Sequence, residues 1–193
     1  MLLTGIGGQG IQLAAQVLAE AALDEGRDVQ LFGAYGGMMR GGSTEATLVV
    51  SDGSIEAPPT VGSAWAALVM HHDYAEPVLH RVRSGGVVLV NTSVWDGPTD
   101  RERFEVVGVR ATDEAVEVGN VLTAAMVMLG ALAVLSGLVS LDALGRAVTR
   151  CVPPYRRQHV EANTRALAAG ARTVPAGKFE AWPVPSPTAP LAR

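Results

Sequence analysis

The sequence begins MLLTGIGGQG over residues 1–10 and continues IQLAAQVLAEAALDEG over residues 11–26. The opening apolar letters are typical of a short buried strand, and a run of glycines follows at once. Between Ile11 and Glu25 the apolar residues recur at helical spacing, and Gly26 is the expected helix stop. A strand, a glycine-rich turn and a helix in this order predict the first unit of a parallel sheet covered by helices.

The same alternation continues along the chain. Strands are expected at residues 1–4, 29–32, 45–51, 66–70, 87–90 and 104–109, and helices at 11–25, 74–83, 121–135, 140–150 and 157–169. The dipeptide Asp52-Gly53 is a turn signal that favours a hairpin between the strand before it and Ser54-Ile55. We therefore predict an α/β fold: a Rossmann-like three-layer domain, with a mostly parallel sheet, helices on both faces and a β-hairpin insertion.

One domain is expected over residues 1–172, and a Pro-rich tail over residues 173–193 is either mobile or a strap lying on a partner. Residues 118–141 contain no charge and are long enough to cross a bilayer. Small and polar residues dilute this stretch, however, and Ser136-Gly137 falls where a helix of a globular protein would stop. The prediction is a buried helix followed by a turn, with no membrane span.

Composition narrows the possible functions. Apolar residues make up 48% of the 193-residue chain and charged residues 18%, which supplies a core. A net charge of −4 argues against binding nucleic acid. Cys151 is the single cysteine, so this chain alone can form neither a disulfide framework nor an iron–sulfur cluster, and the cytoplasm is the expected compartment. Lys178 is the only lysine, which argues against a lysine P-loop or Schiff-base chemistry.

The residues Gly5-x-Gly7-x-x-Gly10 match the dinucleotide-binding fingerprint. Such glycines allow a tight turn, and the following helix offers free amides and a positive dipole end to an anion. A working NAD site also needs an acidic residue at the end of the next strand, but residues 30–35 contain none. Two interpretations remain open: a site for a phosphate or nucleotide, and a turn that is purely structural.

A second glycine-rich segment, GAYGGMMRGGS, covers residues 33–43. Many glycines in a short segment indicate close backbone approach or positive φ. Arg40 stands among them as a cation suited to a carboxylate, a phosphate or an acidic partner, or as a solvated surface arginine. Met38 and Met39 would be adaptable apolar contacts at an interface.

Three further groups are candidates for a site. His71-His72-Asp73 follows a predicted strand, but adjacent residues of a strand point to opposite sides, so we expect helix capping or solvation, or contact with a partner or coenzyme, and no metal site. Asn91-Thr92-Ser93 ends the next strand and could cap a loop or donate hydrogen bonds to a ligand. The pair Arg156-Arg157 opens the last predicted helix, which suggests either a phosphate or acidic partner or a solvated pair. Cys151 is expected to be packed, with no nucleophilic role.

Taken together, the first glycine loop, Tyr35-Gly36, Arg40-Gly41-Gly42 and a strand ending in Ser51-Asp52 resemble the gamma subunit or domain of the 2-oxoacid:ferredoxin oxidoreductases, which act on pyruvate, 2-oxoisovalerate, 2-oxoglutarate or indolepyruvate. The resemblance covers nearly the whole chain short of the tail. It continues through the following positions: residues 85–91, Asn120, Leu129-Gly130 and Asn163.

This resemblance implies a subunit of a complex that oxidatively decarboxylates a 2-oxoacid. The complex is expected to use thiamine diphosphate, Mg, iron–sulfur clusters and coenzyme A, and to pass electrons to ferredoxin or a ferredoxin-like subunit. The partners are thiamine-binding alpha- and beta-type subunits. This chain would supply assembly and part of the coenzyme A site, would contain no catalytic residue, and would bind no cofactor by itself.

The candidate binding residues are Gly5, Gly7, Gly8, Gln9, Gly10, Tyr35, Arg40, Gly41, Gly42 and Asn91. Two alternatives stay open at this point. The chain could be a self-sufficient NAD(P)-dependent oxidoreductase that uses the first glycine loop, or a non-catalytic nucleotide-binding or assembly module.

Overall fold

The computed structural model describes residues 1–35, 41–56, 61–97 and 100–182. The strands are β1 (Leu2–Ile6), β2 (Asp28–Tyr35), β3 (Ser43–Ser51), β4 (Ala64–Val69), β5 (Val82–Asn91) and β6 (Glu105–Val109). The helices are α1 (Ile11–Asp24), α2 (Glu76–Leu79), α3 (Ala111–Val118), α4 (Ala124–Ser136), α5 (Leu141–Cys151) and α6 (Val160–Ala171). Short 3₁₀ helices are η1 (His72–Tyr74), η2 (Val121–Thr123) and η3 (Pro154–His159).

The six strands form one sheet in the order β2-β3-β1-β4-β5-β6. The pairs β1–β4, β4–β5 and β5–β6 are parallel, whereas β3 runs antiparallel to both of its neighbours, β1 and β2. All strands except β3 therefore point in one direction. The prediction of an α/β fold with a mostly parallel sheet is confirmed.

The hairpin insertion exists, but its strands differ from the predicted ones. β2 pairs with β3 over its whole length, from Asp28 opposite Ser51 to Tyr35 opposite Thr44. The predicted strand at Ser54-Ile55 is wrong, because the chain after β3 forms no strand before β4 in the described residues. Instead, the backbone N–H of Ile55 donates to Asp28 Oδ2 at 3.3 Å, which holds this turn against the start of β2.

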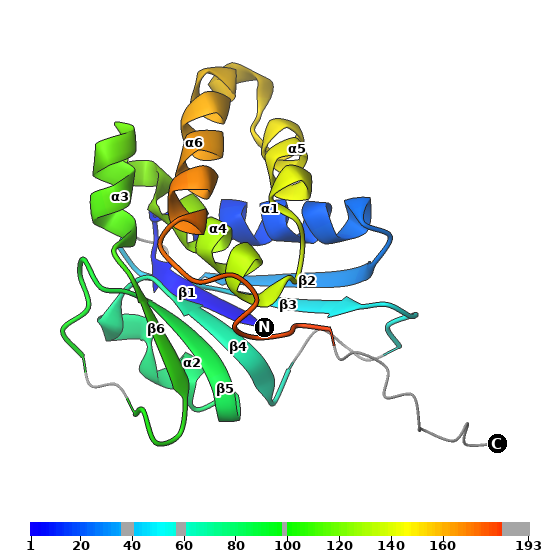
Figure 1. Ribbon diagram of the computed structural model, residues 1–193, viewed down its shortest axis with the longest axis vertical. Coiled ribbons are helices and arrows are strands. Elements are labelled where there is room, and N and C mark those ends of the chain that lie inside the picture. The colour runs from blue at the N-terminus through cyan, green and yellow to red at the C-terminus, as the bar shows by residue number, and fades with distance from the viewer. Residues whose placement is uncertain (36–40, 57–60, 98–99, 183–193) are drawn as a thin grey trace.

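Helices cover both faces of the sheet, very unequally (Figure 1). In the part of the chain that the structure describes, α1, α4, α5 and α6 lie on one face, while only η1 and α2 cover the other. The alternation of side chains along β1 shows the two layers: Leu3 packs in the large cluster under the long helices, and Leu2 in the small cluster that includes Val78 of α2. β1, β4 and the second half of β5 are thus buried on both sides, as the apolar sequences of β4 and β5 require, whereas the edge strand β2 is largely exposed.

Two predicted helices need correction and one helix was missed. The helix expected at residues 74–83 is only the short η1–α2 pair, because Val82 already pairs with Ala64 as the first residue of β5. The last predicted helix starts later, at Val160, after a 3₁₀ segment. α3 was not predicted. Its polar residues conceal a single apolar stripe in which Ala111 and Ala115 are buried.

α4 is the buried helix predicted at residues 121–135, preceded by η2. None of the helices in the described ranges is long and apolar enough for a membrane span. α4 crosses α6 at very short distance, because each helix presents a glycine to the other's backbone. A Cβ added at Gly130 would overlap the carbonyl oxygen of Leu167 and lie 2.8 Å from its carbonyl carbon, and one at Gly170 would lie 2.6 Å from the carbonyl carbon of Val127.

Residues 173–182, the first part of the expected tail, lie along this chain's own surface (Figure 1). The backbone N–H groups of Gly177 and Phe179 donate to carbonyls at the end of α4, both at 2.9 Å. Trp182 Nε1 donates to Leu138 O at 3.1 Å, and the guanidinium of Arg27 stacks 3.9 Å from its ring. The remaining residues of the tail lie outside the described part of the chain.

Candidate functional site

The first glycine loop joins β1 to α1 and opens the amino end of that helix. Gly8 and Gly10 have φ of 106° and 81°, a region that favours glycine. Gly10 stands at the N-cap position, where it has no side chain to accept a hydrogen bond, and the first turn of α1 contains no acidic residue. The positive end of the helix dipole is therefore left without a negative group of its own helix, a geometry that suits an anion.

Two other predicted residues of this loop, Gly5 and Gln9, make contacts within the turn itself. The side chain of Gln9 folds back, and its Oε1 accepts a hydrogen bond from the backbone N–H of Ile6 at 2.8 Å. A Cβ at Gly5 would lie 2.6 Å from that same oxygen and 2.9 Å from Cβ of Met70. Gly5 and Gln9 therefore shape the turn, while Gly7, Gly8 and Gly10 line the cavity described below.

One hydrogen bond joins the second glycine segment to the first, and two more hold the second segment and the strand that follows it against neighbouring elements. The backbone N–H of Gly7 donates to Gly42 O at 2.8 Å, and the hydroxyl of Tyr74 donates to Gly41 O at 3.1 Å. From α1, Gln12 Nε2 donates to Glu45 O at 2.8 Å. Gly42 is thus held next to the first loop, although neither Gly41 nor Gly42 lines the cavity described below, and their role in binding stays a prediction.

Part of that segment lies outside the described residues. Met38, Met39 and Arg40 lie outside the described residues, and for Tyr35 the structure describes the backbone only. The roles proposed for Arg40 and Tyr35 stay predictions.

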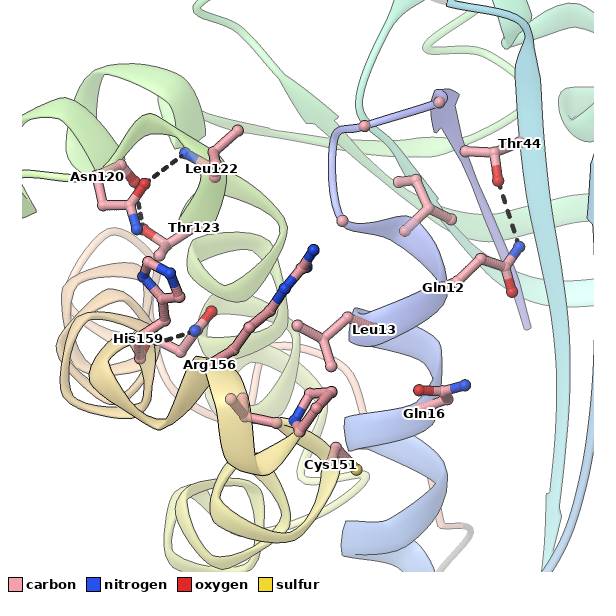
Figure 2. Close-up of a pocket in the computed structure, with 17 residues that line it drawn as sticks. Gln12, Leu13, Gln16, Thr44, Asn120, Leu122, Thr123, Cys151, Arg156 and His159 are labelled. Carbon is pink, nitrogen blue, oxygen red and sulfur yellow. Dashed lines mark hydrogen bonds between the residues drawn. The ribbon is translucent and has the colours of Figure 1, made fainter. Parts of the chain in front are cut away.

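A cavity of about 660 Å³ opens beside the first glycine loop (Figure 2). One wall is the loop and the first turns of α1, and the other is formed by η2, η3 and the residues around them. Its lining consists of Gly7, Gly8, Gly10, Ile11, Gln12, Leu13, Gln16, Thr44, Asn120, Leu122, Thr123, Cys151, Val152, Pro153, Arg156, His159 and Asn163. No aspartate or glutamate is among these residues, whereas Arg156 reaches toward the gap between the two walls. The cavity therefore favours a ligand that combines negative charge with apolar surface.

Two asparagines hold the second wall in place. Asn120 Oδ1 caps η2 by accepting from the backbone N–H of Leu122 at 3.1 Å, and its carbonyl oxygen accepts from Thr123 Oγ1 at 2.7 Å. Asn163 of α6 donates through Nδ2 to His159 O at 2.7 Å, at the end of η3. Both positions belong to the family resemblance, but nothing else in the sequence indicated that they build a cavity.

Cys151 lies at one end of the cavity. Burial, together with the negative charge of Glu20, raises the pKa of its thiol to about 11. A neutral thiol is a poor nucleophile. This agrees with the expectation of a packed cysteine.

Asn91 lies outside the cavity, and its side-chain amide forms hydrogen bonds through both its nitrogen and its oxygen. Its side chain is completely buried, donates through Nδ2 to Thr112 Oγ1 at 2.8 Å, and accepts from the backbone N–H of Thr112 at 3.3 Å. Ser93 likewise accepts from the backbone N–H of Asp113 at 3.1 Å. Asn91 and Ser93 therefore hold the start of α3, as the loop-capping interpretation expects. Neither residue lines the cavity.

The sheet order bears on the dinucleotide interpretation. In a dinucleotide-binding unit the second strand lies directly beside the first, so that its end reaches the ribose. Here β3 lies between β1 and β2. The glycine fingerprint is therefore present without the neighbouring strand that would complete a nicotinamide site.

Comparison with known proteins gives a consistent result. The family model described as pyruvate ferredoxin/flavodoxin oxidoreductase matches residues 1–173. The 2-oxoglutarate synthase subunit KorC of Methanothermobacter marburgensis is 32% identical over 185 residues, covering 91% of this chain and 96% of that protein. The pyruvate synthase subunit PorC of Thermotoga maritima is 31% identical over 172 residues, covering 86% and 89%. Among solved structures, the keto/oxoacid ferredoxin oxidoreductase gamma subunit of Geobacter sulfurreducens PCA has a TM-score of 0.73 at 28% identity, covering 89% of this chain and 95% of that one.

A further relative places the same region inside a longer polypeptide. The ketoisovalerate oxidoreductase subunit VorA of Methanothermobacter marburgensis is 31% identical over 170 residues, and the match covers 88% of this chain but 35% of that protein.

Proposed function

The chain belongs to the pyruvate ferredoxin/flavodoxin oxidoreductase family, and from this premise we propose that it is the gamma-type subunit of a thiamine-diphosphate-dependent 2-oxoacid:ferredoxin oxidoreductase. The observation that carries the proposal is the cavity between the glycine loop and η3. Its lining includes the positively charged side chain of Arg156 and no carboxylate side chain. Its role is to hold part of coenzyme A where this chain meets the thiamine-binding subunits.

The lining fits coenzyme A in its chemistry. The molecule has phosphates joined to a long, less polar arm that ends in a thiol, and this thiol accepts the acyl group when the coenzyme is bound. The amino end of α1 and Arg156 suit the phosphates, because both favour negative charge. Leu13 and Pro153 give the cavity apolar surface for the remainder.

The redox groups of the complex belong to other chains. One cysteine cannot ligate an iron–sulfur cluster, and the thiol of Cys151 is held in its neutral form. In this proposal, thiamine diphosphate and Mg are bound by the alpha- and beta-type subunits, and the clusters by a ferredoxin-like subunit.

Exposed apolar side chains on η2, η3 and α3 suit contact with a partner subunit. Leu122 of η2 is 67% exposed and Tyr155 of η3 is 74% exposed, on the two 3₁₀ segments that form the second wall of the cavity. Val116 and Val121 add two more exposed apolar side chains on α3 and η2. Exposed apolar and aromatic side chains next to arginine are typical of the centre of a protein interface. We assign this surface to contact with the thiamine-binding subunit.

The test uses the complex, made by co-expression of this chain with its thiamine-binding subunits. Leu122→Asp should prevent co-purification, because it places a charge in an apolar contact. Arg156→Ala should leave the complex intact and weaken coenzyme A binding, measured by calorimetry, about tenfold, which corresponds to the loss of one charge-assisted hydrogen bond. Arg83→Ala is the matched control, because Arg83 is exposed on β5 and does not line the cavity.

Equal coenzyme A affinity of the Arg156→Ala and Arg83→Ala complexes would contradict the binding role. Full co-purification of Leu122→Asp would contradict the assembly role. Titration of the single chain with NADH and NADPH tests the alternative enzyme: tight binding would raise the melting temperature and favour a nicotinamide site. The topology of β1, β3 and β2 predicts no such shift.

A further inference from the structure

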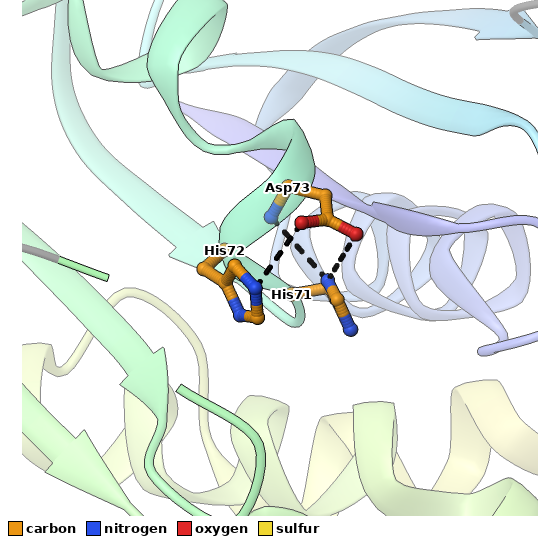
Figure 3. A group of neighbouring side chains, drawn as sticks. All are labelled: His71, His72 and Asp73. Atoms are coloured by element: carbon orange, nitrogen blue, oxygen red, sulfur yellow. Dashed lines mark hydrogen bonds and ion pairs between the residues drawn. The ribbon is translucent and has the colours of Figure 1, made fainter. Parts of the chain in front are cut away.

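Three consecutive side chains, His71, His72 and Asp73, converge at the carboxyl end of β4 (Figure 3). The expectation that the two histidines point to opposite sides is wrong. β4 ends at Val69 and η1 begins at His72, so the backbone turns between them. The imidazole rings stack instead, with centroids 4.5 Å apart and an interplanar angle of 27°.

The carboxylate of Asp73 faces a nitrogen of each ring. Its Oδ2 lies 3.5 Å from Nδ1 of His71, and its Oδ1 lies 3.1 Å from Nε2 of His72. One ligand atom from each residue can be chosen so that all three lie within 4.8 Å of one another. Ligand atoms around a tetrahedral zinc ion, bound at about 2.0–2.1 Å, lie roughly 3.3 Å apart. The two separations between the imidazole nitrogens and the carboxylate, 3.5 Å and 3.1 Å, match this value, and a small rotation of the His71 and His72 rings would bring the third into range.

The other ring nitrogen of His72, Nδ1, gives a second and independent observation. This Nδ1 lies 2.9 Å from Oδ1 of Asp96 and 3.1 Å from the carbonyl oxygen of Val94, two oxygens that can each accept a hydrogen bond from a protonated Nδ1. A histidine that ligates a metal characteristically donates its other ring N–H to a carboxylate or carbonyl, which fixes the tautomer. With the proton on Nδ1, the lone pair of Nε2 points toward the carboxylate of Asp73. Two lone-pair donors then face each other, an arrangement that a cation stabilises.

Nδ1 of His71 must also be free to bind. In the structure it accepts a hydrogen bond from the backbone N–H of Asp73 at 3.3 Å, as the expected helix cap. This distance is long for such a bond. The geometry places Nδ1 on the side of the ring that faces Asp73.

We propose that His71, His72 and Asp73 form a binding site for a divalent cation of the zinc class, with Asp96 as the group that orients His72. Two imidazoles and one carboxylate favour Zn²⁺ or Co²⁺ over Mg²⁺ or Ca²⁺, which prefer oxygen ligands. Three protein ligands leave one position for water or another donor. The adjacent Tyr74 fastens Gly41, so the bound ion would stiffen the turn that holds the second glycine segment.

The test is titration of the full chain with Zn²⁺ by calorimetry and with Co²⁺ by visible absorption. We expect one ion per chain and a tetrahedral Co²⁺ spectrum. His72→Ala and Asp73→Asn should abolish saturable binding, and Asp96→Asn should weaken it about tenfold or more, as removal of an orienting partner does elsewhere. His80→Ala is the control, because the His80 side chain is exposed and its ion pair, with Glu76 at 3.7 Å, lies outside the proposed site.

Far-UV circular dichroism of each variant separates loss of the site from loss of the fold. The proposal is overturned if folded wild-type chain shows no saturable Zn²⁺ binding. It is also overturned if His80→Ala loses as much affinity as His72→Ala, or if folded His72→Ala binds as the wild type does.

Discussion

Replacing Gly130 of α4 with alanine tests the packing that supports the second wall of the cavity. α6 follows η3 directly, and α4 follows η2, so the spacing of these two helices sets the positions of both 3₁₀ segments. A Cβ at position 130 would overlap the carbonyl oxygen of Leu167 and lie 2.8 Å and 3.0 Å from its carbonyl carbon and Cα. These are backbone atoms, so no side-chain rotation relieves the overlap and the two helices must separate.

The expected loss of stability follows from two opposing terms. Overpacking a well-packed interior costs about 1–3 kcal/mol and occasionally more, and an overlap with backbone belongs at the upper end. Alanine regains up to about 1 kcal/mol of helix propensity. The net loss is about 2 kcal/mol or more. For a chain of this length each kcal/mol lowers the melting temperature by about 2–4 °C, which gives a decrease of roughly 4–8 °C.

Thermal unfolding followed by circular dichroism measures this decrease. The matched control is Gly145→Ala in α5, another helical glycine, where an added Cβ meets no atom within 4 Å. This control should gain up to about 1 kcal/mol from helix propensity alone. Equal or higher stability of Gly130→Ala relative to wild type would refute the close approach of α4 and α6.

Other variants test the glycine loop, the acid response and the cysteine. Gly5→Ala should destabilise the chain by about 1–3 kcal/mol, because the added Cβ would lie 2.9 Å from Cβ of Met70. Gly7→Ala should destabilise it much less, because the nearest described neighbour of that Cβ is 3.4 Å away. Chemical denaturation compares the two variants, and equal losses of stability would contradict the geometry. A hydrogen bond from Arg146 holds the pKa of Asp24 below its ordinary value of 3.8. The stability this carboxylate contributes is therefore present above that pH and lost as the pH falls through its lowered pKa, so Asp24→Asn should flatten the acid-unfolding curve, and an unchanged curve would count against the pairing. Because burial raises the pKa of Cys151 to about 11, a thiol reagent should modify the folded chain at pH 8 more slowly than the unfolded chain, and equal rates would count against this burial.

Local patterns predicted those parts of the fold that depend on neighbouring residues. The strand, glycine turn and helix over residues 1–25 follow from apolar spacing and from glycine's freedom at positive φ. Ser140 is a helix cap as predicted, since its Oγ accepts from the backbone N–H of Ala143 at 3.1 Å. Signals of this kind lie within a few residues of the element they specify.

The wrong predictions concern segments whose structure depends on pairing with a strand that is distant in the sequence. Asp52-Gly53 has the composition of a tight turn, yet β3 pairs instead with β2, across residues 36–42, and with β1. The dipeptide specifies a turn, but it does not specify which strand returns beside β3. In the same way, the apolar residues near Val78 allow a longer helix until Val82 pairs with Ala64.

The sequence predicted one wall of the cavity, the glycine loop, and did not predict the other wall. The glycine loop was recognised by its motif, whereas η2 and η3 reach it through folding of segments more than a hundred residues later. The one local signal for η3 was the charge of Arg156-Arg157, which precede α6 and do not open it as predicted. The convergence of His71 and His72 was missed because they were assigned to strand geometry, and the turn after β4 was not foreseen.

The most direct test of the central claim measures 2-oxoacid-dependent reduction of ferredoxin by the co-expressed thiamine-binding and ferredoxin-like subunits, with and without this chain. The account predicts coenzyme A-dependent turnover only when the chain is present, and none from the chain alone. Turnover by the single chain with a nicotinamide cofactor and a small metabolite, or full turnover by the other subunits without it, would contradict the account.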